Sequence, residues 1–112
     1  ILLGIAYKGD IDDVRESPAL KVWEQLEAKG ADVTYFDPYC RLVKLKGKAF
    51  ESCTLDENLL KSSDAVVVTT AHTKGVDYNL VLEASPLILD TKNIISKVTG
   101  VDIKSCPKLH LL

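Results

Sequence analysis

Five stretches of the chain carry hydrophobic patterns that are typical of β-strands. Ile1–Ala6 and Asp64–Thr70 are near-continuous apolar runs, the second rich in valine, as in strands that are covered on both faces. Asp32–Phe36 alternates polar and apolar side chains, and Leu87–Asp90 is a short apolar run. The pattern predicts strands at these four places, and the tail Lys108–Leu112 is expected to add an edge strand.

Helical spacing begins soon after the first predicted strand. From Pro18 onward, apolar residues recur every three to four positions, which marks one buried helix face; they are Ala19, Leu20, Val22, Trp23 and Leu26. Ser17 is a favourable N-cap, Pro18 suits the first helical position, and Gly30 is a favourable stop. Trp23 either packs in the core or an interface, or serves as a platform for a ligand.

Two shorter helical segments separate the later strands. They are Asp56–Ser62, with Thr54 or Asp56 as its N-cap, and Asp77–Ala84. Strands and helices that alternate along a chain imply right-handed crossovers and a parallel sheet with both faces covered. The predicted fold class is therefore α/β: a three-layer sandwich with a Rossmann-like parallel sheet of about five strands, in one domain over residues 1–112. Residues 38–55 are expected to form an irregular connection.

That connection holds a local run of positive charge, made by Arg41, Lys44, Lys46 and Lys48. Such a run is either a patch for phosphate or nucleic acid, or solvated surface. Few aromatic residues lie among these cations and the chain carries a net charge of −2, so we favour solvated surface and expect no nucleic-acid partner. No apolar run approaches the roughly 20 residues of a membrane span, so no membrane partner and a cytoplasmic location are expected.

The cysteines give no sign of a disulfide framework or a metal site. Cys40, Cys53 and Cys106 are odd in number and form no C-x-x-C motif, so we interpret them as isolated thiols of a reducing cytoplasm. Zinc needs a fourth ligand, and neither His72 nor His110 lies near a cysteine pair in sequence. The sequence has no Met and opens inside a predicted strand, so we expect it to be a fragment of a longer protein.

The loop between the first strand and the first helix is the main candidate site. It holds two cations, Lys8 and Arg15, among the carboxylates Asp10, Asp12, Asp13 and Glu16. A strand, a charged loop and a helix N-terminus together are a common anion-binding arrangement, because unpaired N–H groups and the helix dipole face the crevice above the strand. The alternative is that the carboxylates only neutralise the two cations in a solvated loop.

Polar residues also follow the ends of the later strands. Asp37 ends the second predicted strand, where dinucleotide folds hold a ribose, but the preceding turn lacks G-x-G-x-x-G and we do not expect that role. His72 follows the valine-rich strand and either faces a ligand or makes a structural hydrogen bond to the loop. Asp90–Asn93 places polar side chains beyond another strand end.

A long motif occupies the same loop. Residues Gly4–Ala19 read Gly-x-Ala-Tyr-Lys-x-Asp-x-Asp-Asp-x-Arg-Glu-Ser-Pro-Ala, with further matches at Asp37–Tyr39, at Asp64–Val68 leading to His72, and at Asp90–Asn93. This pattern closely resembles the C-terminal domain of nucleotide-sugar dehydrogenases, the UDP-glucose/GDP-mannose dehydrogenase family. The resemblance covers most of the chain and fades after about Gly100.

The resemblance implies a part in a larger enzyme. Members of the family carry an NAD-binding domain, a helical middle domain that holds the catalytic cysteine and oligomerises, and a last domain that grips the nucleotide end of the sugar nucleotide. They oxidise the sugar C6 alcohol to a carboxylate in two NAD-dependent hydride transfers, through a thiohemiacetal and a thioester. For residues 1–112 the resemblance implies the nucleotide-sugar-binding domain, with NAD bound mainly elsewhere, no catalytic residue in this chain, and no activity of the chain alone.

The family's contacts fall on particular residues here. Its substrate-contacting aromatic–lysine pair falls on Tyr7 and Lys8, and its arginine that reaches the NAD falls on Arg15. Its usual Asp-x-Arg substrate contact stands as Asp90-x-Lys92, where lysine keeps the charge but loses the planar fork. The resemblance is closest to UDP members acting on an N-acetylhexosamine or glucose, which make polysaccharide precursors.

The partners implied are a UDP-sugar, other domains of the same enzyme and further copies of the full-length protein. Two alternatives stay open at this point. One is a stand-alone, non-catalytic nucleotide-binding module, and the other is an oligomerisation module with an interface through the face that carries Trp23.

Overall fold

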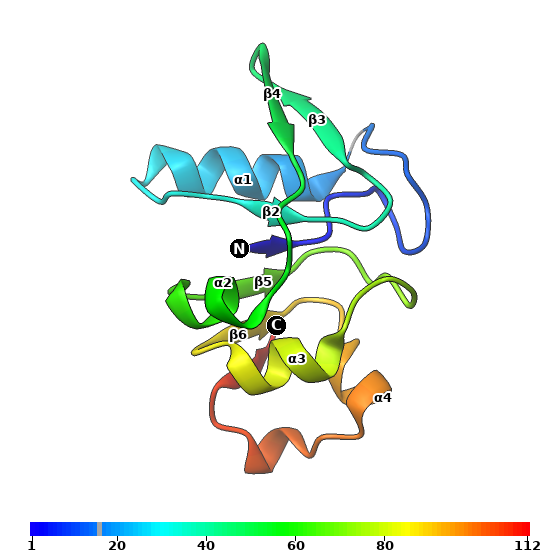
Figure 1. The fold of residues 1–112 in the computed structure, drawn as a ribbon, viewed down its shortest axis with the longest axis vertical. Coiled ribbons are helices and arrows are strands. Elements are labelled where there is room, and N and C mark those ends of the chain that lie inside the picture. The colour runs from blue at the N-terminus through cyan, green and yellow to red at the C-terminus, as the bar shows by residue number, and fades with distance from the viewer. Residues whose placement is uncertain (16) are drawn as a thin grey trace.

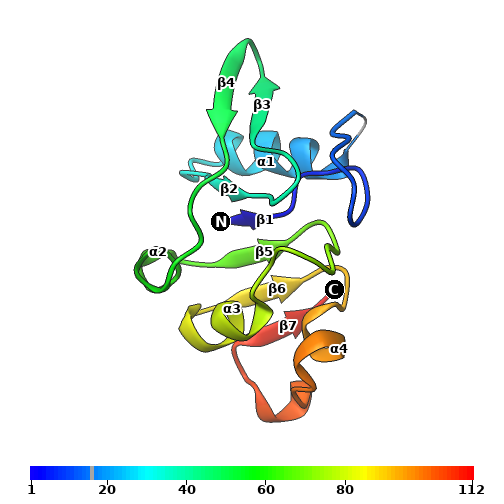
Figure 2. The ribbon, with the colours of Figure 1, turned by 45° about the vertical axis from the view of Figure 1, so that its right-hand side comes forward.

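Five parallel strands form the central sheet of the protein, a computed structural model that describes residues 1–15 and 17–112. The strands are β1 (Leu2–Leu3), β2 (Tyr35–Phe36), β5 (Val66–Val68), β6 (Ile88–Asp90) and β7 (Leu109–Leu111). Their order across the sheet is β2-β1-β5-β6-β7, and every neighbouring pair is parallel (Figure 2). The expected five-stranded parallel sheet is confirmed. Glu16, one of the loop carboxylates named above, lies outside the described residues.

Helices cover the sheet from two sides (Figure 1). They are α1 (Pro18–Ala28), α2 (Glu57–Ser62), α3 (Tyr78–Ala84), α4 (Ile95–Thr99) and a short 3₁₀ turn, η1 (Ile103–Ser105). Side chains alternate across a strand, so Leu2 packs with α1 in one core cluster while Leu3 packs with α2, α3 and α4 in the other. The three-layer architecture follows from this division.

The first helix forms for the reasons read from the sequence. The Ser17 side chain accepts a hydrogen bond from the Ala19 N–H at 3.3 Å, and Pro18 fills the first helical position. The helix ends at Ala28 with Lys29 as its C-cap, and Gly30 follows with φ +94°, a conformation that glycine adopts without strain. In α2, Asp56 rather than Thr54 is the cap, since its carboxylate accepts from the Leu59 N–H.

The expectation of an irregular connection over residues 38–55 is wrong. Strands β3 (Leu42–Leu45) and β4 (Lys48–Glu51) form an antiparallel hairpin joined by Lys46 and Gly47, both with positive φ. Two such residues give the tight turn whose twist matches that of paired strands. The basic side chains on the hairpin are exposed, as expected of solvated surface.

The hairpin also resolves the role of Trp23. Its indole is 1% exposed and lies against Tyr35 and Phe50, with ring centroids 5.5 and 4.9 Å away. Val43 and Leu45 complete this cluster from β3. Trp23 is therefore a core residue that joins α1 to the hairpin, and its ring is covered within the chain.

The remaining differences concern lengths. Strands β1, β2 and β5 are two to three residues long, shorter than the predicted runs. Beyond their ends, the side chains of Asp37, Thr69 and Thr70 hydrogen-bond to the backbone of the β1 loop. Helix α4 and turn η1 were not predicted from the sequence. Among the helices of the described chain, none has the length and apolar character needed to cross a membrane.

Candidate functional site

The expected site residues gather along the carboxyl edge of the sheet, on the right of Figure 2. Tyr7 and Lys8 follow β1, Lys92 follows β6, and β5 lies between these strands. The Tyr7 side chain is 53% exposed, and both lysines are exposed as well. Within residues 1–15 and 17–112, no salt bridge involves Lys8 or Lys92. Parallel α/β sheets bind their ligands at this edge.

The loop that carries Tyr7 and Lys8 is held by close backbone contacts. A Cβ on Gly9 would lie 2.2 Å from the carbonyl oxygen of Ala71, so only glycine fits between the loops that follow β1 and β5. Gly4 has φ +92°, and a Cβ there would lie 2.4 Å from the Cβ of Thr70. These two glycines let the β1 loop lie directly on the β5 loop.

Asp37 anchors the same edge from the end of β2. Its side chain is 1% exposed, and its Oδ2 accepts hydrogen bonds from the N–H groups of Ile5 and Ala6 at 2.8 and 3.1 Å. Its Oδ1 accepts from the N–H groups of Tyr39 and Cys40 at 2.8 and 3.1 Å. Burial alone would raise the pKa of Asp37, but these hydrogen bonds, with one from His72, outweigh it and lower that pKa. The carboxylate has no oxygen left for a ribose.

His72 is buried beside Asp37 and uses both ring nitrogens. Its Nδ1 accepts a hydrogen bond from the Asp10 N–H at 2.9 Å, which places the ring proton on Nε2. Nε2 therefore donates to Asp37 Oδ2, also at 2.9 Å. Of the two alternatives for His72, the structure shows the hydrogen bond to the loop.

Asp10 joins the β1 loop to the β5 loop through its side chain as well. Its carboxylate accepts from the Thr73 N–H at 2.8 Å, from the Thr73 hydroxyl at 2.5 Å and from the Lys74 N–H at 3.3 Å. The Tyr39 hydroxyl adds a bond at 3.4 Å. These bonds, that of the Thr73 hydroxyl foremost, lower the pKa of Asp10. The sequence marks Asp10 only as one of several acidic loop residues, so this junction was missed.

Arg15 forms a two-point ion pair with Asp13. The guanidinium Nε and Nη2 donate to the two carboxylate oxygens at 3.0 and 2.9 Å, and the Arg15 backbone N–H donates to the same group. This pairing lowers the pKa of Asp13 to about 2. The pair lies in solvent, with 88% of the Arg15 side chain exposed, so it contributes little to stability.

Lys92 extends from a turn fixed by Asp90. The Asp90 carboxylate is 1% exposed and accepts from the N–H groups of Lys92 and Ile95 at 3.0 and 2.8 Å. Asp90 thus shapes the backbone, while the Lys92 ammonium stays in solvent. In the Asp-x-Lys pattern the aspartate is a structural residue and the lysine is the residue available to a ligand.

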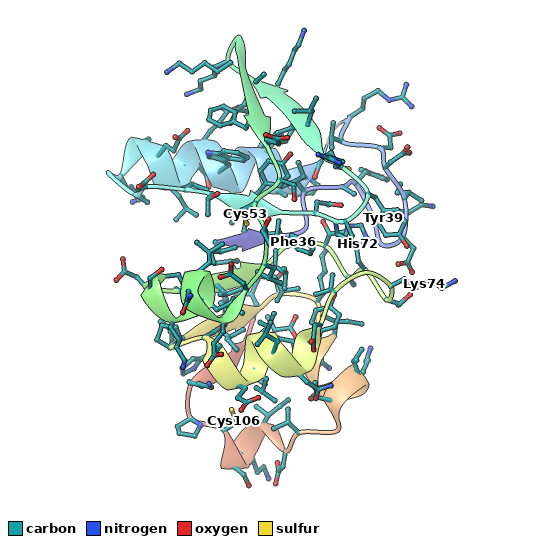
Figure 3. The ribbon with its side chains drawn as sticks, viewed as in Figure 1. Phe36, Tyr39, Cys53, His72, Lys74 and Cys106 are labelled. Carbon is teal, nitrogen blue, oxygen red and sulfur yellow. The ribbon has the colours of Figure 1, made fainter. Side chains whose placement is uncertain are left out.

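The cysteine thiols are not candidate nucleophiles at the carboxyl edge. All three cysteines are free, and Cys106 lies far from Cys53 (Figure 3). Cys40 is buried, and burial, with the nearby charge of Asp37, raises its pKa to about 12, so it remains a thiol at neutral pH. In the part of the chain that the structure describes, no group of three His, Cys, Asp or Glu side chains is placed to bind a metal.

A cavity of about 590 Å³ lies at the opposite edge of the sheet. It is lined where β1, β2 and β5 begin, by Ile1, Ala31–Thr34, Leu59 and Ser62–Ala65 among others. The expected site residues are absent from its lining. The carboxyl edge, with its exposed cations, therefore remains the candidate ligand site.

The fold and this edge define the class: a Rossmann-like α/β domain whose charged loop follows the first strand. The chain belongs to the UDP-glucose/GDP-mannose dehydrogenase family, and residues 1–97 match the UDP binding domain of that family.

Relatives agree with this assignment. A UDP-N-acetyl-D-mannosamine dehydrogenase of Methanococcus maripaludis is 35% identical over 114 residues, which cover 92% of this chain and 25% of that protein. A UDP-glucose 6-dehydrogenase of Rickettsia bellii is 35% identical over 107 residues, which cover 84% of this chain and 23% of that protein. The solved UDP-D-ManNAc dehydrogenase of Pyrococcus horikoshii superposes with a TM-score of 0.67 at 28% identity, over 98% of this chain and 24% of that one. The chain spans about a quarter of the length of these relatives.

Proposed function

We propose that this chain is the UDP-sugar-binding domain of an NAD-dependent dehydrogenase that oxidises the sugar C6 alcohol to a carboxylate. The observation that carries the proposal is the loop that lies directly on the β5 loop at the carboxyl edge, with the exposed Tyr7 ring and Lys8 ammonium. Membership of the family supports the reaction class, and the matched domain is the one that binds UDP.

The chemistry of the edge suits a sugar nucleotide. Two strand spacings separate β1 from β6, about 10 Å, so the flexible Lys8 and Lys92 side chains can converge on one diphosphate. The Tyr7 ring offers a flat apolar face to the uracil or the sugar. Lysine at position 92 supplies a point charge without the paired donors of arginine, so it constrains the phosphate orientation less.

Arg15 is proposed to contact NAD that is held mainly by another domain. Its fork already binds a carboxylate in the two-point geometry that a phosphate would use, since Asp13 receives both bonds. To reach the cofactor, the guanidinium must exchange Asp13 for a phosphate. The exposed pair is weak enough to allow that exchange.

The other parts of the activity are assigned outside this chain. The relatives are about four times longer, and Cys40 with its raised pKa is unsuited to act as the nucleophile. We therefore propose that a separate domain binds NAD and supplies the catalytic cysteine, that the whole protein is a homo-oligomer, and that it works in the cytoplasm on precursors of polysaccharides.

The proposal is tested by titrating the ¹⁵N-labelled chain with UDP-N-acetylglucosamine, UDP-glucose and GDP-mannose while recording amide NMR shifts. The expected result is saturable shifts for the UDP-sugars, centred on Tyr7–Asp10 and Thr91–Asn93, with weaker effects from GDP-mannose. Shifts centred instead on the cavity residues Ala31–Thr34, or no shifts at millimolar ligand, would contradict it.

A further inference from the structure

Three loops meet at the His72 imidazole. Asp10 comes from the loop after β1, Asp37 and Tyr39 from the end of β2, and His72 itself from the loop after β5. The Tyr39 ring lies over the imidazole with centroids 4.8 Å apart (Figure 3). His72 is 1% exposed, so its imidazole does not touch a ligand at the carboxyl edge.

We propose that His72, in its neutral form with the proton on Nε2, is a positioning residue for sugar-nucleotide binding, because it fixes Asp10 and through it the Tyr7–Lys8 loop. The inference rests on the proposed function. It adds that binding depends on the protonation state of a residue that never contacts the ligand.

Near its tip, the loop is attached to the β5 loop through Asp10 and through the close approach of Gly9 to Ala71. Its base is closed by a hydrogen bond from the Tyr7 N–H to the Asp13 carbonyl at 2.6 Å. Asp10 lies two residues beyond Lys8 and has φ +62°, a backbone conformation that is uncommon for residues other than glycine. Other contacts must therefore stabilise the Asp10 backbone in this conformation. The bond to His72 Nδ1 holds its backbone, and the bonds from Thr73 hold its carboxylate.

Protonation of His72 would remove the side-chain hydrogen bond that holds the Asp10 backbone N–H. An imidazolium carries hydrogen on both nitrogens, so Nδ1 would face the Asp10 N–H as donor against donor. Four charged or titratable groups surround His72. The Asp37 carboxylate accepts from Nε2, and the Asp10 carboxylate belongs to the residue whose N–H donates to Nδ1. The other two are the phenols of Tyr39, which packs on the imidazole, and of Tyr78, whose hydroxyl donates to the His72 carbonyl. Asp37 keeps its bond to Nε2 in either state, so protonation releases the Asp10 side and leaves the Asp37 side intact.

Two substitutions separate positioning from folding. His72→Phe keeps a flat ring under Tyr39 but removes both hydrogen bonds. His72→Asn places an amide oxygen near the position of Nδ1 and keeps an acceptor for the Asp10 N–H, while Asp37 retains its four backbone donors. His110→Asn is the matched control, because His110 is exposed on β7 at the far edge of the sheet.

The first measurement needs no ligand. The scalar coupling across the hydrogen bond between the Asp10 nitrogen and His72 Nδ1, and hydrogen exchange of the Lys8, Gly9 and Asp10 amides, are recorded by NMR as the pH is lowered. The coupling is expected to vanish and exchange, corrected for its intrinsic pH dependence, to accelerate at least tenfold as the His72 ring gains its second proton. A coupling that persists, or exchange that does not follow the His72 titration, would overturn the inference.

The second measurement is the dissociation constant of UDP-N-acetylglucosamine, whose diphosphate diester keeps its charge over the same pH range. In the wild-type chain, affinity should fall about tenfold in step with His72 protonation. At neutral pH, His72→Phe should bind about tenfold more weakly, and His72→Asn within roughly threefold of wild type and without the pH dependence. Equal affinity in all three chains would overturn the inference while the proposed function stands. Loss of binding in the wild type would contradict the proposed function, and the amide exchange would still show whether His72 holds the loop.

Discussion

Replacing Asp37 by Asn tests how the carboxyl edge is assembled. The change keeps the size of the side chain but removes its charge and turns one acceptor oxygen into an NH₂ donor. Five N–H groups point at the two carboxylate oxygens, three at Oδ2 and two at Oδ1. Whichever way the amide is placed, its NH₂ group faces at least two buried donors.

The smaller loss arises when the amide oxygen takes the place of Oδ2 and the NH₂ group faces Tyr39 and Cys40. Two hydrogen bonds to a charged acceptor are then lost, at about 1.5–3 kcal/mol each, and relaxation of the loops recovers part of this. We expect the free energy of unfolding to fall by about 3–5 kcal/mol. For a domain of this size, that lowers the melting temperature by about 12–20 °C.

Urea unfolding of the wild type and Asp37→Asn measures this difference, with Asp32→Asn as the control because Asp32 is exposed. The Asp37 pKa is lowered in the folded chain, so its stabilisation is complete above the ordinary carboxyl pKa of about 3.9 and is lost as the pH falls through the lowered value. The gap between the two chains should therefore narrow below about pH 4. A loss under 1 kcal/mol at pH 7, or a gap that widens in acid, would refute the reasoning.

Three further predictions concern other parts of the chain. Trp23→Ala should lower the free energy of unfolding by about 3–5 kcal/mol, measured by urea unfolding, because it removes the side chain that joins α1 to the hairpin; a loss below 1 kcal/mol would contradict the packing. Gly9→Ala should weaken UDP-sugar binding in the NMR titration, because its Cβ would meet the Ala71 carbonyl at 2.2 Å and displace the loop; unchanged affinity would show that the contact is not required. Arg15→Ala should barely change the melting temperature of the chain while raising the KM for NAD of the whole enzyme, with Arg15→Lys restoring only part of the loss; a large salt-dependent melting shift with unchanged NAD kinetics would make the pair with Asp13 structural.

Much of the fold was accessible from the sequence because its signals are local. The Ser17–Pro18 start, the apolar spacing of α1 and the valine-rich run of β5 depend on neighbouring residues. The hairpin was missed although its signal was present: Val43 and Leu45 alternate with exposed residues before the Lys46–Gly47 turn. The run of lysines favoured the interpretation as a solvated connection, and the exposed Leu42 and Ala49 break the alternation of polar and apolar residues.

The junction at the carboxyl edge could not be predicted, because its partners are distant in the sequence. Asp37 and His72 are 35 residues apart, and Asp10 and His72 are 62 apart. The sequence shows each of them as a polar residue near a strand end, and only the strand order brings the three ends together. It likewise could not show that Arg15 pairs with Asp13, since several carboxylates were within reach.

The central claim is that the Tyr7–Lys8 loop holds the UDP-sugar. Its most direct test compares Lys8→Ala with the matched control Lys48→Ala, an exposed lysine on the hairpin, in the whole enzyme under steady-state conditions. The loss of one charge-assisted contact, about 1.5–3 kcal/mol, predicts that Lys8→Ala raises the KM for the UDP-sugar about tenfold or more, while the KM for NAD and the behaviour of Lys48→Ala stay near wild type. If the KM for NAD rises instead and that for the UDP-sugar does not, Lys8 is not a substrate contact and the account is contradicted.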